Sequence, residues 1–292
     1  MQKFQPNKKI NVYLDTNILL NLREIPFSDI LNLFCSQLSI VELIAGMATE
    51  REYRARRHAL IKIKERQINI IWQSPKTLLT KAFGIPHIDH DVLATMIMMQ
   101  RIIETEEFSE AGSIYFHLGG NKYTIEKFAN HDKETSEESS ELLKGLLNLR
   151  KELIEEAKNI EINPQIIDNW SDMTASSFLN RIGYKEKGFQ YIIYWNNYKS
   201  FKSMKNGISF LMIYNILAII HHNIPGRNDG IDLAHLSYTD DMDLFISNDK
   251  IFRKFKKYSN LEMLSLKEFL DSINKPNNTP TTFRGCDRVK LQ

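Results

Sequence analysis

Acidic residues from both ends of the 292-residue chain stand at positions that a folded sheet would bring together. Asp15 directly follows an apolar run, Glu42 lies in an apolar helical segment, and Asp249 comes just after a second apolar run. Asp229 and Asp232 share one face of a further helical segment. Clustered carboxylates repel one another, and a bound cation relieves that repulsion. The pattern therefore predicts a divalent-cation site, and oxygen ligands favour Mg²⁺ or Mn²⁺ over zinc.

Strand-like and helical segments alternate at both ends of the chain, and this alternation predicts the sheet that would position the acids. The run from Ile10 to Asp15 is typical of a buried strand with an acid at its carboxyl end. Ser39 and Glu42 have the spacing of a capping box, which predicts a helix from Ile40. The expected strands are 10–15, 37–39, 69–72, 243–247 and 261–265, and the expected helices are 17–22, 40–47, 49–66, a segment from 75, 208–222, 229–238, 250–258 and 266–273.

The alternation stops between residues 84 and 206, where helical periodicity and charge dominate. Within that part, the acidic and Ser-rich stretch 131–140 predicts an exposed connection, and 141–159 predicts a long surface helix. We therefore expect an α/β fold in which residues 1–83 and 207–274 form a parallel sheet flanked by helices, with residues 84–206 as a large helical insertion. The Pro-, Asn- and Thr-rich residues 275–292 predict a disordered tail.

Four motifs together resemble the PIN-domain family of metal-dependent nucleases. They are VYLDTNILL at 12–20, LSIVEL at 38–43, NDGIDLAHLSY at 228–238 and DLFISNDK at 243–250. The resemblance covers residues 9–66 and 206–273, and it implies that these two parts form a PIN-like core. It also implies an enzyme that hydrolyses phosphodiester bonds with Mg²⁺ or Mn²⁺, with RNA as the first substrate class and DNA as the second.

The same resemblance assigns roles to single residues. The metal-binding, catalytic acids would be Asp15, Glu42, Asp232 and Asp249. Asn17 would help to order the site, and Asp229 remains a further metal-binding candidate that the sequence does not rank cleanly against Asp232. Apart from the resemblance, the spacing of His235 three residues after Asp232 places it on the same helical face, where it would support the metal ligands without binding the ion. One or two ions would bind the scissile phosphate and lower the pKa of a bound water.

Each acid also has an ordinary structural explanation. Asp15 and Asp249 stand where an acid can cap the next helix, and Glu42 can complete a capping box with Ser39. Capping one helix would not require the other acids, so the complete set favours the metal site. A phosphatase of the phospho-aspartate type would need a second acid where Asn17 stands. The alternative function is a catalytically silent PIN-like scaffold that binds a protein partner through its helical insertion.

The charge balance predicts that any nucleic-acid surface is local, because 38 Lys and Arg residues face 36 Asp and Glu residues, for a net charge of +2. The expected helix 49–66 carries the basic side chains best placed to follow a phosphate backbone beside the acids. These are Arg51, Arg54, Arg56, Arg57, Lys62, Lys64 and Arg66. Aromatic and lysine residues alternate at 184–205, but their helical spacing favours core packing over base stacking. Binding of a protein partner or of a second copy of the chain is a further alternative.

The cysteines and apolar segments predict a cytoplasmic protein without a membrane segment. Cys35 and Cys286 are far apart and have no CxxC partner, which fits a reducing compartment. The longest apolar stretch, Phe210–Ile220, contains Asn215 and is shorter than the ~20 residues that a bilayer requires. The basic N-terminal residues are not followed by the apolar region of a secretion signal.

Overall fold

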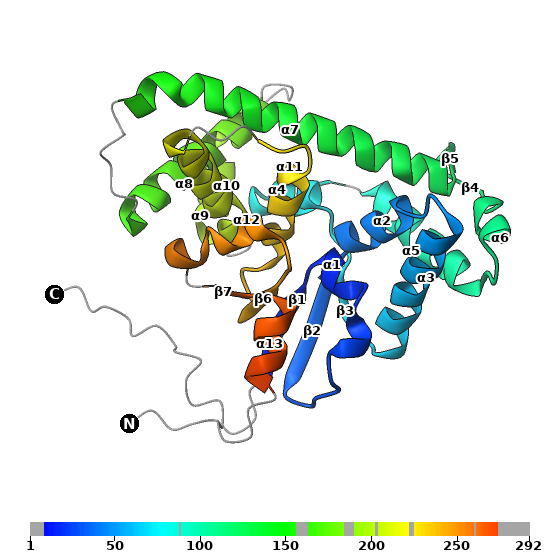
Figure 1. Ribbon diagram of the computed structural model, residues 1–292. Helices are drawn as coiled ribbons and strands as arrows, with labels where there is room; N and C mark the ends of the chain where they lie inside the picture. The colour runs from blue at the N-terminus through cyan, green and yellow to red at the C-terminus, as the bar shows by residue number, and fades with distance from the viewer. Residues whose placement is uncertain are drawn as a thin grey trace.

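The computed structural model describes residues 9–87, 89–155, 163–183, 190–201, 204–221, 225–259 and 261–273 (Figure 1). Its centre is a sheet of five parallel strands in the order β3-β2-β1-β6-β7. These strands are β1 (Ile10–Leu14), β2 (Leu31–Ser36), β3 (Asn69–Ile71), β6 (Leu244–Ile246) and β7 (Glu262–Leu264). The expected α/β class with a parallel sheet flanked by helices is confirmed. The tail expected at 275–292 lies outside the described residues.

The two central strands, β1 and β6, are apolar on both faces, as buried parallel strands are. Val12, Tyr13 and Leu14 are buried, and so are all three residues of β6. The N–H of Asp15 donates to the carbonyl of Ile246 at 3.1 Å, so the pairing of the two strands extends to the first residue after β1. Because every strand runs in the same direction, the residues that follow β1, β2 and β6 meet at one edge of the sheet.

The second strand lies earlier in the chain than expected. The strand predicted at 37–39 is wrong, because residues 31–36 form β2 and residues 37–45 form the helix α2 (Gln37–Ala45). Ser36 caps this helix by accepting a hydrogen bond from the N–H of Ser39 at 3.2 Å, so the capping box predicted for Ser39 and Glu42 is also wrong. The polar residue Asn32 hid the strand pattern. Its side chain bonds Asn11 and Asn69 on the two neighbouring strands at 3.0 and 2.7 Å.

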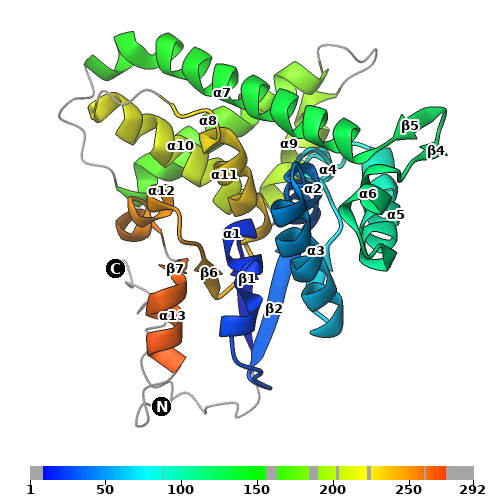
Figure 2. The same ribbon diagram turned by 45° about the vertical axis from the view of Figure 1, so that its right-hand side comes forward.

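Helices cover both faces of the sheet (Figures 1 and 2). Those that pack on the face bearing Val12 and Leu14 are α1 (Thr16–Leu19), α2, α3 (Glu50–Glu65), α5 (His90–Glu104) and α13 (Leu266–Ile273). Those that pack on the face bearing Tyr13 are α4 (Pro75–Ala82), α8 (Pro164–Gly183), α9 (Tyr191–Ser200), α10 (Lys205–Ile220), α11 (Asp229–His235) and α12 (Lys250–Arg253). The sequence therefore places most helices correctly. Three of the predicted helices are shorter and are followed by the 3₁₀ turns η1 (Leu22–Glu24), η3 (Leu236–Tyr238) and η4 (Lys256–Tyr258).

Two apolar cores lie on the two faces of the sheet, and residues 84–206 contribute to both of them together with the rest of the chain. Helix α5 packs on one face of the sheet, and α8 and α9 pack on the other. This part also contains the helix α6 (Phe108–Gly112) and a hairpin of β4 (Phe116–Leu118) and β5 (Asn121–Tyr123), which the sequence did not predict. The aromatic side chains described at 190–201 pack against the second core, as the core-packing interpretation predicted. None of the described helices is both long and apolar enough to cross a lipid bilayer.

Helix α7 (Ile125–Glu155) crosses the molecule above the carboxyl edge of the sheet and packs against α2, α10 and α11 (Figures 1 and 2). The exposed connection predicted at 131–140 is wrong, because these residues lie inside α7. Its serines are small enough for a close helix crossing. Ser136 donates to the carbonyl of Arg227 at 2.9 Å, and a Cβ atom added to Gly230 of α11 would come within 2.4 Å of the Cβ of Ser139. A Ser-rich sequence therefore forms a contact surface here and not a loop.

Asp89 links the start of α4 to the start of α5, and its substitution tests how much this link stabilises the fold. Its carboxylate accepts hydrogen bonds from the hydroxyls of Ser74 and Thr77 and from the N–H groups of Asp91 and Val92 at the start of α5. Burial alone would raise the pKa of Asp89, but these hydrogen bonds outweigh burial and lower it. We expect Asp89→Ala to reduce the free energy of unfolding by about 1–2 kcal/mol at pH 7, as loss of a helix cap does.

The effect of this substitution should depend on pH in one direction. Because the pKa of Asp89 is lower in the folded than in the unfolded chain, its contribution is present above the unfolded pKa of about 4 and is lost as the pH falls further. Urea unfolding of the wild type and the variant should therefore converge in acid. A stability difference that is constant from pH 7 to pH 3 would contradict the assignment.

Candidate functional site

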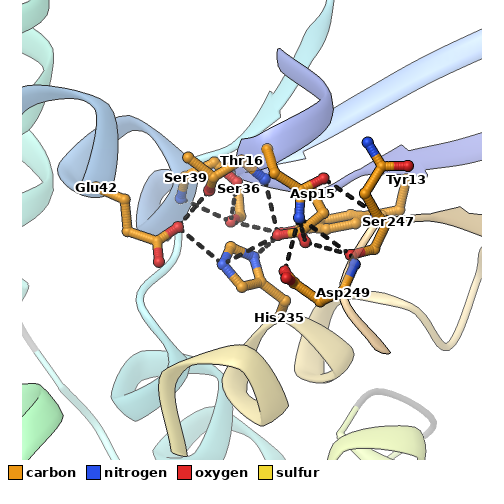
Figure 3. A network of polar contacts seen from close by, with 11 residues as sticks. Tyr13, Asp15, Thr16, Ser36, Ser39, Glu42, His235, Ser247 and Asp249 are labelled. Atoms are coloured by element: carbon orange, nitrogen blue, oxygen red, sulfur yellow. Dashed lines mark hydrogen bonds and ion pairs between the residues drawn. The ribbon is translucent and has the colours of Figure 1, made fainter. Parts of the chain in front are cut away.

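The residues that follow β1, β2 and β6 form a polar network at the carboxyl edge of the sheet (Figure 3). Asp15 is its centre and is 4% exposed. One carboxylate oxygen of Asp15 accepts the N–H of Thr16 at 2.7 Å, which caps α1. The other accepts the hydroxyl of Ser247 at 2.6 Å and the side-chain amide of Asn17 at 2.8 Å. Asp15 therefore caps a helix and also belongs to a network of polar side chains, so its capping role does not separate it from the other acids.

Asn17 connects Asp15 to a second acid. Its Nδ2 atom lies 2.6 Å from Oδ2 of Asp249 as well as 2.8 Å from Oδ2 of Asp15. Its own side-chain oxygen accepts the N–H of Asn248 at 3.2 Å. Asp249 occupies the capping position of α12 but makes no capping hydrogen bond there. The ordinary explanation for Asp249 is therefore not realised, and Asn17 has the geometry of a residue that orders two carboxylates.

Glu42 approaches the cluster from the second turn of α2. Its Oε2 atom accepts the hydroxyl of Thr16 and lies 2.9 Å from Nε2 of His235. The guanidinium of Arg56 donates to the backbone carbonyl of Glu42 at 3.0 Å. Burial alone would raise the pKa of Glu42, but His235 and Thr16 outweigh burial and lower it. Glu42 is therefore an anion that is held in place by groups from α1, α3 and α11.

The structure separates the two acids of α11 that the sequence did not rank. Burial, followed by the charges of Asp15 and Asp249, raises the pKa of Asp232 to about 8. No hydrogen bond from another described residue reaches the Asp232 carboxylate. Asp229 instead accepts the hydroxyl of Tyr214 and the N–H of Gly226 at 2.9 Å, which closes the turn before the helix. Asp232 therefore belongs to the acid cluster, while the partners of Asp229 indicate a structural role.

His235 is the cationic group at the centre of this network. Its Nε2 atom lies 3.6 Å from Oδ1 of Asp15 in addition to its contact with Glu42, and its Nδ1 atom lies 2.8 Å from the hydroxyl of Tyr13. Burial alone would lower the pKa of His235, but Glu42, Asp15 and Asp232 outweigh burial and raise it to about 9. The imidazolium therefore offsets part of the negative charge of the cluster.

Several members of the network were missed by the sequence analysis. Thr16, Ser247 and Tyr13 were not assigned roles, although Thr16 stands inside the Asp-Thr-Asn motif. Asp132 was placed in the wrongly predicted connection at 131–140, but on α7 its pKa is raised by burial and then by the charge of Glu42. The signal for these residues is spatial, because each becomes a neighbour of the acids only when distant segments pack together.

The donor chemistry of the cluster fits a hard divalent cation. Asp15, Glu42, Asp232 and Asp249 offer carboxylate oxygens, which Mg²⁺ and Mn²⁺ prefer. Burial and then repulsion from Asp15 and Asp249 raise the pKa of Asp232, and a cation would relieve the repulsion. Among the described residues, no three His, Cys, Asp or Glu side chains already surround one point as a metal shell would. The imidazole of His235 lies between Glu42 and Asp15 (Figure 3). The acids are therefore gathered, but their ligand shell is not preformed.

The basic side chains of α3 mostly stabilise the fold. Arg57 donates to the carbonyls of Ile102 and Ile103 at the end of α5, and Arg66 donates to the carbonyls of Leu22 and Pro26. Two other basic side chains of this helix form ion pairs at its surface, Arg54 with Glu50 and Lys62 with Glu65. Arg57 and Arg66 therefore bond the fold, Arg51 and Arg54 are exposed, and the track for a phosphate backbone stays a prediction.

Comparison with known proteins identifies no relative, because no protein-family model, curated protein or solved structure matches the chain. The resemblance to PIN-domain nucleases rests on the four motifs alone and stays a hypothesis.

Crowding of the acids predicts that the metal-free protein loses stability as the pH rises. The pKa of Asp232 is about 8 when folded and about 4 when unfolded, so the folded chain holds an extra proton between these values and stability falls across that range. His235, with a folded pKa of about 9, adds a fall between about pH 6.5 and 9. We expect Asp232→Asn to raise the free energy of unfolding at pH 8.5 in EDTA by about 1–3 kcal/mol.

Thermal or urea unfolding of both proteins between pH 5 and 9 checks this expectation. Asp241→Asn is the control for removal of a carboxylate, because Asp241 is exposed and is not one of the four clustered acids. Identical pH dependence of the wild type and Asp232→Asn would show that Asp232 is not crowded by the other acids.

Proposed function

We propose that this protein is a metal-dependent nuclease that hydrolyses phosphodiester bonds, with RNA as the substrate class that its motifs favour. The observation that carries the proposal is the convergence of four carboxylates from opposite ends of the chain at one edge of the sheet. Asp15 and Asp249 both accept the side-chain amide of Asn17. After burial, the charges of these two acids raise the pKa of Asp232. Fold stability alone does not call for such crowding, because it carries an electrostatic cost.

In this function the four acids would hold the cation, and the neighbouring side chains would hold the acids. Asn17 and Ser247 fix the orientation of Asp15, and Thr16 and His235 fix that of Glu42. A bound Mg²⁺ or Mn²⁺ would supply Lewis-acid chemistry, which polarises the scissile phosphate and makes a water more acidic. Asp132 on α7 adds a further carboxylate near Glu42. The residues of the chain thus hold the acids near one another before a substrate arrives.

The substrate class follows from the motifs. The Asp-Thr-Asn sequence after β1 and the Ser-Asn-Asp sequence after β6 resemble those of PIN-domain nucleases, which mostly cut RNA, so RNA is the first substrate to test and DNA the second. The acid cluster itself fits either polymer, because both carry the same phosphodiester group.

Two substitutions test the proposal. Labelled RNA and DNA are incubated with the protein in Mg²⁺, Mn²⁺ or EDTA, beside Asp15→Asn and Asp232→Asn. We expect metal-dependent cleavage that falls at least about a hundredfold in both variants, since each loses a ligand of the ion. Asp232→Asn is the sharper variant because its carboxylate accepts no hydrogen bond from the described residues, so its loss of activity should coincide with higher stability at pH 8.5.

Asp241→Asn is the control for loss of an acid close to β6, and it should cleave like the wild type. Equal cleavage by Asp15→Asn and the wild type would identify a contaminating nuclease and overturn the proposal. Absence of cleavage on RNA and DNA of varied structure in both metals would favour the silent scaffold.

A further inference from the structure

His235 is held at both ends of its ring. The side chain is 1% exposed, with Nδ1 lying 2.8 Å from the hydroxyl of Tyr13 and Nε2 lying 2.9 Å from Oε2 of Glu42. A ring whose two nitrogens both have partners cannot rotate about its Cβ–Cγ bond without losing both contacts. The imidazole therefore has one orientation in the site (Figure 3).

The group that contacts Nδ1, the hydroxyl of Tyr13, is held in a fixed position. Tyr13 lies on the central strand β1 with no exposed surface, and its ring stacks on Tyr238 and Phe245 at centroid distances of 6.0 and 5.6 Å. Its hydroxyl donates to the hydroxyl of Ser36 at the end of β2, at 2.7 Å. The position of the Tyr13 hydroxyl is thus fixed by the core of the sheet, and His235 transmits that position to the acids.

The contact at Nε2 controls one oxygen of Glu42. Oε2 accepts the hydroxyl of Thr16 and faces Nε2 of His235, whereas no hydrogen bond of the described residues reaches Oε1. The same Nε2 atom lies 3.6 Å from Oδ1 of Asp15. One imidazole nitrogen therefore lies between two carboxylates that would otherwise repel each other, and Oε1 of Glu42 is left for another ligand.

From this geometry we infer that His235 is a positioning residue of the cation site. Its contact with Tyr13 fixes the ring, and the ring sets the separation and orientation of the Glu42 and Asp15 carboxylates. Mg²⁺ or Mn²⁺ then binds the acids and does not contact the imidazole. The inference rests on the proposed function. Groups that orient metal ligands in this way typically contribute 10–100-fold to metal affinity.

Affinity for Mn²⁺, measured by isothermal titration calorimetry without substrate, tests the inference at both ends of the ring. His235→Gln can place an amide N–H near Glu42 but cannot bond Tyr13, and His235→Asn can bond Tyr13 but falls short of Glu42. We expect roughly 10–100-fold weaker binding for Asn and a smaller loss for Gln. A residue that only packs the core would give similar losses for both variants or a larger loss for Gln.

Tyr13→Phe removes the hydroxyl that contacts His235 and keeps the stacked ring. We expect this substitution to weaken Mn²⁺ binding several-fold. Tyr53→Phe is the matched control, because Tyr53 is also a buried tyrosine whose hydroxyl bonds one side chain, Thr105, at 2.8 Å. It should bind Mn²⁺ like the wild type. Circular dichroism establishes that each variant is folded, and the conservative Gln and Phe variants keep the test valid if His235→Asn unfolds.

Pulsed electron paramagnetic resonance of the Mn²⁺ complex separates positioning from direct ligation. We expect no strong ¹⁴N coupling, since both ring nitrogens bond protein groups; a strong coupling lost in His235→Gln would make His235 a ligand and overturn the inference. Wild-type affinity in all three variants would overturn it as well, while leaving the nuclease proposal intact. Tight Mn²⁺ binding without any cleavage would overturn the nuclease proposal and not the role of His235. Absence of Mn²⁺ binding by the wild type would overturn both.

Discussion

Repulsion among four buried or half-buried carboxylates is the constraint on which the organisation of the site depends. Asp15, Glu42, Asp232 and Asp249 come from four different elements, and the parallel sheet brings those elements to one edge. The surrounding groups all reduce the cost of this arrangement. Asn17, Ser247 and Thr16 donate hydrogen bonds to the acids, and the imidazolium of His235 lies between two of them. An apolar substitution at any of these donors would remove part of the compensation of a buried or half-buried charge.

The sheet and the acids could be predicted from sequence where the signal is local. Residues 12–14 of β1 and residues 244–246 of β6 are apolar runs with an acid one to three residues later, and that pattern gives both the strand and the position of Asp15 or Asp249. The signal failed where a polar residue has a partner in another segment. Asn32 broke the pattern of β2 because it bonds Asn11 and Asn69, and the serines of α7 suggested a loop because their contacts with α11 are invisible in the sequence. The choice between Asp229 and Asp232 also needed three dimensions, since only Tyr214 and Gly226 reveal the role of Asp229.

Helix α7 shows how a segment outside the motifs becomes part of the site. It crosses above the two helices that carry Glu42 and Asp232, and the crossing is close because Gly230 lies against Ser139. A Cβ atom at position 230 would come within 2.4 Å of the Ser139 Cβ, so any residue other than glycine would force the two helices apart. The same crossing carries Asp132 into the electrostatic range of Glu42. The middle of the chain therefore shapes the environment of acids that its own sequence gives no reason to connect with it.

The separation in sequence between the halves of the site has a consequence for synthesis. The hydroxyl of Ser247 and the carboxylate of Asp15 are 232 positions apart, yet they form one of the shortest contacts of the network. A chain emerging from the ribosome presents Asp15 early, but β1 lacks its neighbour β6 until residues 244–246 have been translated. The nascent polypeptide therefore cannot assemble the acid cluster before that point, and any chemistry that the cluster performs begins only after β6 has been translated.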